Sequence, residues 1–353
     1  MAISLLRLWK LRSYEEAEFK PSPSTTLVLG FNGAGKSSLI EATALFATLS
    51  SPRTSHLAQL VKDAQPEGGA RLETSSGSEL EFRIRGGRAL LRAQGSGVAA
   101  KNFLGRFRAV VFGPEDLDLV RGEPDLRRRA LDDLLTQLRP SYRALRSDYD
   151  RALRQRNAAL RQGAALEAAM FDAPLAATGA QILDARRRLI SDLAPAVTDL
   201  YELLSGAGTA TVRYRNSTTE HELSGHDLEA HLLEVYSSTI QVDLERGTTR
   251  VGPHRDDLEI EVDGLAARSY SSRGEQRSAA LSLRLAELRL LEDPVLLLDD
   301  VLSELDPDRR ARVFKVVGEC QVILTATDPA SVPESAPVDS VWRVSEGRLH
   351  EAA

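Results

Sequence analysis

Short apolar stretches separated by glycine turns dominate the first third of the chain. Thr25–Leu29 is β-branched and apolar, which favours a buried strand, and the apolar residues that follow predict a helix to about Leu49. The opening residues, including Leu5, Leu6 and Leu8, favour a first strand. Further strands are predicted at residues 69–74, 79–84, 88–93 and 109–112, and Gly113 and Pro114 end the last of them. We therefore expect a mixed strand region with one helix.

The hydrophobic pattern becomes helical between about Asp125 and Met170. Two parallel apolar rows repeat every seven residues, one with Leu131, Leu138 and Leu145 and the other with Leu135, Tyr142 and Tyr149. Pro174 and Gly179 are expected to break the pattern, and a second helical stretch covers residues 182–204. Two helices with matching apolar rows predict an antiparallel hairpin or a small inserted helical lobe.

Strand patterns return after the helical region. Residues 209–263 are strand-like, with strands predicted at 209–215 and 258–262, and a long helix is predicted over 274–291. A strand at 295–298, a helix from Pro307 to about Val317, a strand at 321–325 and a final strand near 341–344 complete the pattern. The sequence thus predicts an α/β protein whose first domain is discontinuous, formed by residues 1–113 and 209–353, with residues 114–208 as an inserted helical lobe.

Composition adds limits on the class of protein. The chain has 353 residues, a net charge of −6 and one cysteine, Cys320, so no internal disulfide is possible. No apolar run approaches the length of a membrane span, and the N-terminus lacks the layout of a signal peptide, so we expect a cytoplasmic protein without a membrane partner.

The charge is unevenly distributed. Residues 83–108 contain no acid and seven basic residues, which are Arg83, Arg85, Arg88, Arg92, Lys101, Arg106 and Arg108. This asymmetry predicts a basic face on an acidic protein. An ordinary solvated sheet edge would have the same composition, and the sequence leaves both interpretations open.

A phosphate-binding loop stands between the strand Thr25–Leu29 and the helix after it. Its residues are Gly30, Phe31, Asn32, Gly33, Ala34, Gly35, Lys36 and Ser37, followed by Ser38. Strand, glycine-rich turn and helix form the context that makes this pattern specific for nucleoside triphosphates. The glycines let backbone N–H groups surround an anion, and the helix N-terminus adds unpaired donors. Lys36 is expected to reach the β- and γ-phosphates, and Ser37 to hold Mg²⁺.

The matching acidic motif lies far downstream. The apolar residues 295–298 are followed by Asp299 and Asp300. Asp299 is predicted to hold Mg²⁺ at a strand end, and Asp300 stands where a second acid could orient the attacking water.

A third motif precedes the long helix. Ser272 with Glu275 three residues later forms a capping-box pattern. The same helix N-terminus could instead direct the Ser272 hydroxyl and the Gly274 N–H to a phosphate. The two readings are compatible, and the residues alone do not decide between them.

Taken together, these motifs resemble those of ABC-type ATPases. A Ser-x-Gly-x-Gln-like signature lies shortly before the Walker-B acids, residues 303–306 are similar to a D-loop, and residues 325–328 lie where the switch loop belongs, without its usual histidine. Within that superfamily the chain resembles the RecF family of SMC-related DNA-repair ATPases. Segments matching the family pattern run along nearly the whole chain, at 30–37, 112–117, 252–257, 272–277 and 298–306.

The resemblance implies an ABC-type ATPase head, with a mixed β lobe and a P-loop core, into which a short coiled-coil-like helical lobe is inserted. It implies ATP and Mg²⁺ as cofactors, and Lys36 and Asp300 as the residues of a weak ATPase. Two copies would enclose two ATP molecules head to tail, with Ser272, Gly274 and Glu275 of one copy on the nucleotide of the other. ATP would hold this homodimer together, and hydrolysis would release it.

A RecF-like protein would bind DNA at gaps and single-strand–duplex junctions in replication and repair. It would cooperate with RecR and RecO in loading RecA, with a part in the SOS response. The basic stretch 83–108 is the first candidate for phosphate contacts, and arginines of the helical lobe between 127 and 154 are the second. For residues 252–257 we prefer a plain turn as the local description, because Gly-Pro precedes charged residues and His254 has no partner cluster for a metal. The resemblance implies a family-specific role for this segment, with Arg255 in the nucleotide or DNA environment.

Two other functions share part of these features. A nucleotide-binding subunit of an ABC transporter has a compact insert, whereas the interval before the signature exceeds 150 residues in this chain. A structural SMC-like tether would need a much longer coiled coil.

Overall fold

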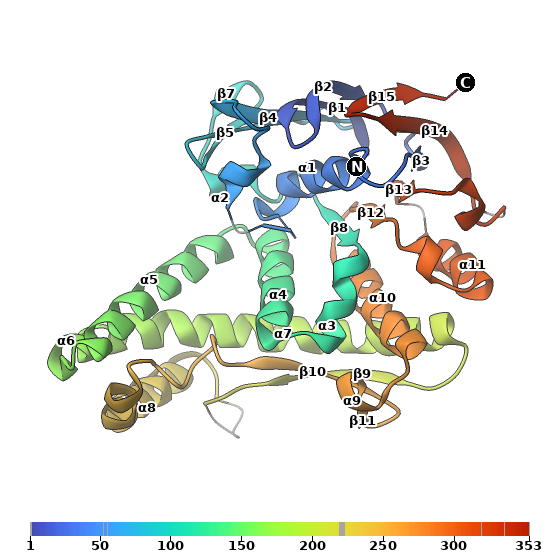
Figure 1. Ribbon diagram of the computed structural model, residues 1–353. Helices are drawn as coiled ribbons and strands as arrows, with labels where there is room; N and C mark the ends of the chain where they lie inside the picture. The colour runs from blue at the N-terminus through green and yellow to red at the C-terminus, as the bar shows by residue number, and fades with distance from the viewer. Residues whose placement is uncertain are drawn as a thin grey trace.

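The computed structural model describes residues 2–51, 53–54, 56–218, 223–318, 320–334 and 336–352. Residues 219–222 lie outside these ranges; they belong to the stretch 219–263, which contains twelve acidic residues and three arginines. Figure 1 shows most of the strands in the upper half of the molecule and most of the helices in the lower half.

A six-stranded antiparallel sheet covers the top of the molecule. Its order is β2 (Tyr14–Phe19), β1 (Ile3–Leu11), β4 (Glu67–Thr74), β5 (Glu79–Arg85), β6 (Arg88–Ala93) and β7 (Ser96–Gly97). The expected strands at 69–74, 79–84 and 88–93 are therefore present. The strand β2 was missed because half of its residues, Glu15, Glu16 and Glu18, are charged.

The second sheet is the central one. Its order is β15 (Arg348–Glu351), β14 (Val338–Ser345), β3 (Thr25–Leu29), β13 (Val322–Ala326), β12 (Val295–Asp299) and β8 (Ala109–Phe112). All its neighbouring pairs are parallel except β14 with β15. Because parallel strands are buried on both faces, β12 and β13 are buried at every position and mostly apolar rather than alternating.

The two faces of the central sheet belong to different cores. On β12, Val295 and Leu297 pack with α1 (Lys36–Thr48) and the antiparallel sheet, and Leu296 and Leu298 pack with the helices of the lower half. Figure 1 shows α1 between the upper sheet and the helices below. This arrangement holds the central sheet, and the loops at its edge, between two buried layers.

The lower half is helical, with a small sheet on its outer side. Its helices are α3 (Asp118–Arg121), α4 (Pro124–Leu138), α5 (Tyr142–Arg161), α6 (Ala165–Ala169), α7 (Asp172–Ser205), α8 (Gly225–Arg246), α9 (Ala267–Tyr270) and α10 (Arg273–Leu290). The small sheet has the order β11 (Leu265–Ala266), β10 (Asp257–Val262) and β9 (Ala210–Arg215). Two short helices, α2 (Ala100–Phe103) and α11 (Pro307–Val316), lie in the upper half and near the C-terminal part of the central sheet.

The expected helix break at Pro174 and Gly179 is wrong. A single helix of 34 residues, α7, runs from Asp172 to Ser205 and crosses the molecule in Figure 1. Pro174 falls in its first turn, where a missing N–H removes no helical hydrogen bond. Gly179 lies inside the helix at a close approach to α5, since a Cβ there would come within 3.3 Å of the Tyr149 ring.

The prediction that residues 209–263 are strand-like throughout is also wrong, because α8 occupies 22 of them. The division of the chain at 113/114 and at 208/209 stays a prediction. The strands β9 and β10 and the helix α8 pack beside α7, in one core with the helical lobe.

Candidate nucleotide-binding site

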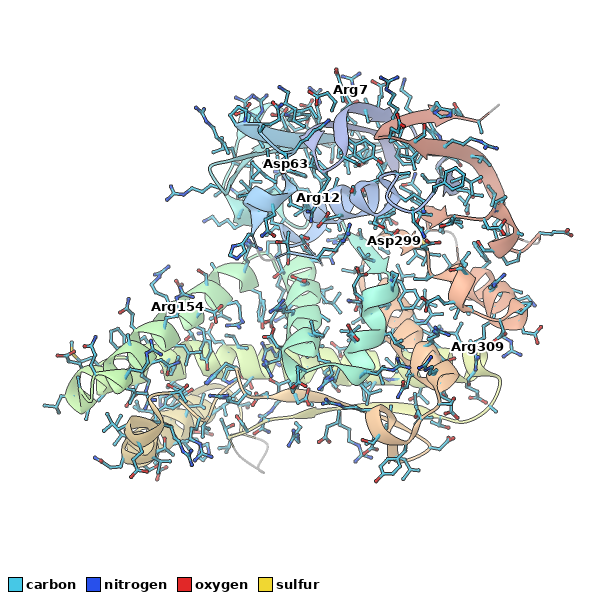
Figure 2. The ribbon with its side chains drawn as sticks, in the orientation of Figure 1. Arg7, Arg12, Asp63, Arg154, Asp299 and Arg309 are labelled. Carbon is cyan, nitrogen blue, oxygen red and sulfur yellow. The ribbon has the colours of Figure 1, made fainter. Side chains whose placement is uncertain are left out.

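The phosphate loop and the downstream acids meet at one edge of the central sheet. β3, β13 and β12 are adjacent and parallel, so their carboxyl ends point the same way. Residues 30–37 follow β3, Thr327 follows β13, and Asp299 and Asp300 end and follow β12. Ligands of α/β sheets bind at such carboxyl edges. The edge lies between the upper and lower halves of the molecule, where Figure 2 labels Asp299.

The loop backbone needs its glycines. Gly35 has φ +123° and is the N-cap of α1, and a Cβ there would lie 2.7 Å from the Ser13 hydroxyl oxygen. Gly33 has φ +80°, and Gly30 packs against Val344 so closely that a Cβ would lie 2.6 Å from its carbonyl oxygen. The Tyr14 hydroxyl donates to the Gly35 carbonyl at 2.8 Å. The loop is thereby held open around the N-terminus of α1.

The side chains along the loop differ in exposure. Phe31, Asn32 and Gly33 are exposed at its tip, with 83% of Phe31 accessible. Ala34 is half-buried, as are Ser37 and Ser38 in the first turn of α1. The N–H groups of this first turn have no side-chain cap, so they are available to an anion.

Lys36 is buried at the base of the loop. Its Nζ donates to the Gly30 carbonyl at 2.7 Å and to the Thr327 hydroxyl at 3.1 Å. It also lies 3.9 Å from Asp300 Oδ2. These contacts hold the ammonium group inside the loop, where the phosphates of a nucleotide would lie.

Thr327 joins both motifs and was not among the expected site residues. Its hydroxyl lies 3.1 Å from Asp300 Oδ2 and 3.2 Å from Asn32 Oδ1, in addition to its contact with Lys36. It stands in the segment 325–328 that resembles a switch loop. The resemblance pointed to this segment, and the folded chain identifies Thr327 as the residue within it that contacts Lys36 and Asp300.

Asp299 is buried at the end of β12. Its Oδ1 accepts a hydrogen bond from the Thr325 hydroxyl at 2.8 Å, and the same Thr325 oxygen accepts from the Asp300 N–H at 3.0 Å. Asp300 has φ +56°, an uncommon value that aspartate tolerates better than most residues. The turn aims Asp300 toward Lys36, and Asp299 faces the other side of the loop.

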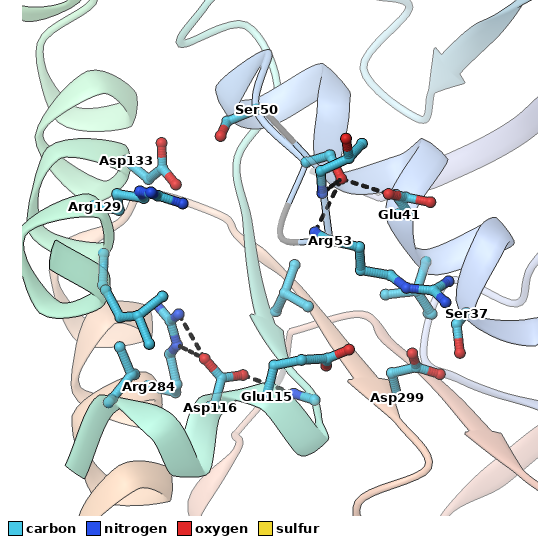
Figure 3. Close-up of a pocket in the computed structure, with 18 of the residues that line it drawn as sticks. Ser37, Glu41, Ser50, Arg53, Glu115, Asp116, Arg129, Asp133, Arg284 and Asp299 are labelled. Atoms are coloured by element: carbon cyan, nitrogen blue, oxygen red, sulfur yellow. Dashed lines mark hydrogen bonds and ion pairs between the residues drawn. The ribbon is translucent and has the colours of Figure 1, made fainter. Parts of the chain in front are cut away.

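On that side lies a cavity of about 560 Å³ between the two halves of the molecule. Ser37, Asp299 and Glu115 line one side of it, and Arg129 and Asp133 of α4 line the other, as Figure 3 shows. Asp116 accepts from the Gly113 N–H at 2.7 Å and from Arg284 at 2.6 Å. These bonds fix the turn that carries Glu115 beside Asp299.

The signature residues do not join this site in the chain itself. Ser272 caps α10: its hydroxyl accepts from the Glu275 N–H at 3.3 Å, and its own N–H donates to the Glu275 carboxylate at 2.6 Å. Gly274 lies against Arg309 of α11, where a Cβ would come within 3.0 Å of a guanidinium nitrogen. Among the described residues, no hydrogen bond or ion pair links Ser272, Gly274 or Glu275 to residues 30–37.

In the structure, some residues of the basic stretch 83–108 have partners within the chain and others are exposed. Arg83 pairs with Glu81 at 2.7 Å, Arg108 pairs with Glu292 at 3.2 Å, and Arg106 donates to the Asn102 carbonyl at 2.6 Å. Arg85 and Arg88 stand opposite each other on the β5–β6 hairpin. Arg92 on β6 and Lys101 on α2 are exposed as well.

No helix among the described residues is both long and apolar enough to cross a bilayer. Nor do the described residues include a group of three or more His, Cys, Asp or Glu side chains arranged to hold a metal ion.

Comparisons with known proteins agree with this geometry. Residues 2–349 match the family model described as the RecF/RecN/SMC N terminal domain. The chain is 39% identical to the DNA replication and repair protein RecF of Acidothermus cellulolyticus, with both chains covered in full. It is 37% identical to the protein of the same name from a Synechococcus species, over 97% of this chain and 94% of the relative.

Solved structures show the same likeness. A structure described as the recombination mediator protein RecF-ATPrS in the RecFOR pathway has a TM-score of 0.91 and 28% identity, over 99% of this chain and 98% of that one. The corresponding RecF-ATP structure has a TM-score of 0.90 at the same identity, over 100% of this chain and 98% of that one. An SMC head bound to the C-winged helix domain of ScpA, 16% identical with a TM-score of 0.59 over 100% of this chain and 97% of that one, shares the fold.

Proposed function

The chain belongs to the RecF family of DNA replication and repair proteins, and from that premise we propose that it is an ATP-dependent DNA-binding protein of recombinational repair. One observation carries the proposal: Lys36 of the phosphate loop, Asp300 after β12 and the Thr327 hydroxyl form one hydrogen-bonded group. Such a group responds to a γ-phosphate, because the phosphate would compete with Asp300 for the lysine and the hydroxyl.

ATP would occupy residues 30–38, with its phosphates on the loop N–H groups and on Lys36. The residues present also fit Mg²⁺. The Ser37 side chain and Asp299 line one cavity, and Asp299 Oδ2 has no hydrogen-bond partner among the described residues. Mg²⁺ keeps several waters and shares its ligands with substrate phosphates, so a cluster of three protein carboxylates is not required. Ser37 and Asp299 would hold the ion, which would neutralise phosphate charge.

The isolated position of the signature supports a homodimer. Ser272, Gly274 and Glu275 cap the start of α10 and make no described contact with the phosphate loop of their own chain. We propose that they contact the ATP of a second copy, head to tail. Asp300 would orient the attacking water and Lys36 would stabilise the transferred phosphoryl group, in a weak ATPase that serves as a switch.

The wider role that we propose for the chain is taken from its RecF relatives. We propose that the dimer binds DNA at gaps and single-strand–duplex junctions. There it would act in the cytoplasm with RecR and RecO to load RecA, and it would contribute to the SOS response.

Sedimentation velocity with ATP and Mg²⁺, with ADP and Mg²⁺, and without nucleotide tests the dimer. We expect dimer with ATP and monomer in the other two conditions, because only the γ-phosphate links the two copies. Lys36→Ala is the matched control and should remain monomeric with ATP, with unchanged thermal stability of the nucleotide-free protein. A wild-type monomer in all three conditions would refute the dimer.

A further inference from the structure

Most arginines of the helical half are already neutralised. Arg127 is buried and forms two hydrogen bonds with Asp257, at 2.7 and 3.0 Å. Arg146 pairs with Asp132 at 3.0 Å, and Arg151 pairs with Asp148 at 3.3 Å. These residues cannot be the main contacts of a polyanion without breaking ion pairs.

One open groove lies where α8 ends. It has a volume of about 510 Å³ and is lined by Arg246, Thr248, Arg250 and Arg255, without any acid. The three arginines are exposed, and no carboxylate of the described residues lies within ion-pair distance of them. On a chain with a net charge of −6, three unpaired guanidinium groups facing one groove require an explanation.

The groove is preorganised by its backbone. Arg255 donates from Nε and Nη2 to the Thr249 carbonyl, at 3.3 and 3.2 Å, and from Nη2 to the Thr248 hydroxyl at 3.4 Å. These bonds use Nε and Nη2 and leave the two N–H groups of Nη1, so the guanidinium can still bind an anion. Gly247, with φ +65°, ends α8 directly after Arg246 and turns the chain into the groove.

A buried ion network fixes this turn from below. Arg156 of α5 is fully buried and bonds Asp172 of α7, Asp243 of α8 and the Thr249 hydroxyl, at 2.7, 2.7 and 2.8 Å. Asp243 in turn accepts from the Arg250 N–H at 3.2 Å. Three helices therefore hold the loop that presents Arg250 and Arg255, and rigid placement lowers the entropy lost when a ligand binds.

The same loop begins the segment 252–257, which the sequence suggested as a plain turn. Gly252 has φ +127°, and a Cβ there would lie 2.8 Å from the hydroxyl oxygens of Tyr149 and Tyr236. His254 bridges Tyr149 and the Thr249 carbonyl, at 2.6 and 3.0 Å, and burial lowers its pKa to about 4. Residues 252–257 thus form a rigid support. Among these six residues, Arg255 is the exposed charged side chain.

We propose that the groove formed by Arg246, Thr248, Arg250 and Arg255 binds the phosphodiester backbone of DNA. The inference rests on the proposed DNA-binding function and gives it a surface. Guanidinium groups without carboxylate partners release counterions from DNA without first breaking an ion pair. Thr248 adds a hydroxyl of the kind that commonly contacts phosphates. Because the groove offers charge and no base-reading pocket, it recognises backbone rather than sequence.

The test compares two triple variants with the same loss of charge. One is Arg246→Gln, Arg250→Gln and Arg255→Gln in the groove, and the other is Arg85→Gln, Arg88→Gln and Arg92→Gln on the β5–β6 hairpin. Binding of two fluorescent duplexes of unrelated sequence is measured by anisotropy, with ATP and Mg²⁺, between about 50 and 200 mM salt. For the groove variant we expect roughly 10-fold or greater loss of affinity for both duplexes, and a salt slope smaller by about 3. The hairpin variant should change less.

The outcomes separate the inference from the proposed function. If wild type does not bind either duplex, the DNA-binding function itself fails. If wild type binds and the groove variant keeps its affinity and salt slope, the groove is not the contact. Loss for only one of the two sequences would also overturn backbone recognition. Because Arg255 supports its own loop, the double variant Arg246→Gln and Arg250→Gln is measured beside the triple. A salt slope smaller by about 2 with unchanged thermal melting is expected there, and an unchanged slope would overturn the inference.

Discussion

At the scale of single residues, Asp133 is a carboxyl group whose charged form is destabilised by burial. It lies on α4 and lines the cavity between the two halves, opposite Ser37 and Asp299 (Figure 3). Burial raises the pKa of its carboxyl to about 7, and the neighbouring Asp132 adds to the rise, whereas Arg284 and Arg143 oppose it. Glu287 also faces this region, and burial raises its pKa to about 7. The charged form of Asp133 is thus disfavoured at neutral pH.

Asp133→Asn should therefore stabilise the protein at high pH. The folded pKa exceeds the unfolded value, so the penalty is absent below about pH 4, grows between pH 4 and 7, and is complete above 7. A shift of that size corresponds to about 4 kcal/mol, but cavity water screens part of it, and we expect on the order of 2 kcal/mol at pH 8. Urea unfolding of both proteins at pH 5 and pH 8 measures the difference.

The control is Asp192→Asn, which makes the same chemical change at an exposed position of α7. It should alter the free energy of unfolding by less than about 0.5 kcal/mol at both pH values. An Asp133→Asn variant whose stability difference from wild type is the same at pH 5 and pH 8 would contradict the assigned pKa.

Much of the candidate site could be predicted residue by residue, but Thr327, Thr325 and Glu115 were not among the expected site residues. Gly30 through Ser37 form a pattern that occurs in a single structural context, and Asp299 follows from the buried strand before it. Thr327 could not be found in this way. Its importance depends on the parallel order of β3, β13 and β12, which brings a hydroxyl to Lys36, Asn32 and Asp300.

At the scale of elements, the N-terminus of α10 serves two purposes that one side chain can separate. Ser272 caps the helix through a reciprocal bond with Glu275, and this role needs only a short oxygen acceptor. In the proposed dimer the same hydroxyl also faces the γ-phosphate of the partner, and this role excludes negative charge.

Ser272→Asp should therefore keep the helix and lose the dimer. Aspartate is as good an N-cap as serine, so the free energy of unfolding should change by less than about 0.5 kcal/mol. Its carboxylate would repel the phosphate, so sedimentation with ATP should show monomer.

Ser272→Ala provides the comparison, since it removes the cap without adding charge. It should lower stability by about 1 kcal/mol and weaken the dimer less than Ser272→Asp does. If Ser272→Asp forms the dimer as readily as wild type, the residue acts as a helix cap alone.

The elements that sequence reasoning missed have physical explanations. α8 buries only a thin row, Leu228, Leu232, Tyr236 and Asp243, and the rest of its surface is polar, so its helical period is weak. α7 passes Pro174 and Gly179 without a break because one lies in the first turn and the other makes room for Tyr149. For α8 and for Gly179 the deciding contacts come from other helices, whereas Pro174 is tolerated because of its place in the first turn.

At the scale of the whole molecule, the central sheet separates two cores and carries the site at its edge. One face packs against α1 and the antiparallel sheet, and the other against the helical half. The phosphate loop, Thr327, Asp299 and Asp300 all lie at that edge. The capped end of α10 makes no described contact with the loop. In the proposed dimer these would be two half-sites, which a second copy would join.

Mixing variants tests whether each site is shared between copies. In a head-to-tail pair of Lys36→Ala with Ser272→Asp, one site joins an intact Lys36 to an intact Ser272 and the other carries both changes. In a pair of wild type with the double variant Lys36→Ala, Ser272→Asp, each site carries one change. Both pairs contain the same substitutions, so any difference comes from their arrangement.

The fluorescent label is placed on Lys36→Ala in the first mixture and on the double variant in the second. With ATP and Mg²⁺, we expect more labelled heterodimer from the first mixture than from the second. Sedimentation velocity with fluorescence detection measures both. A site completed within one chain predicts the reverse order, because only the wild-type subunit of the second mixture would then have an intact site. The order of the two mixtures therefore decides whether Lys36 and Ser272 act on the same ATP from one chain or from two.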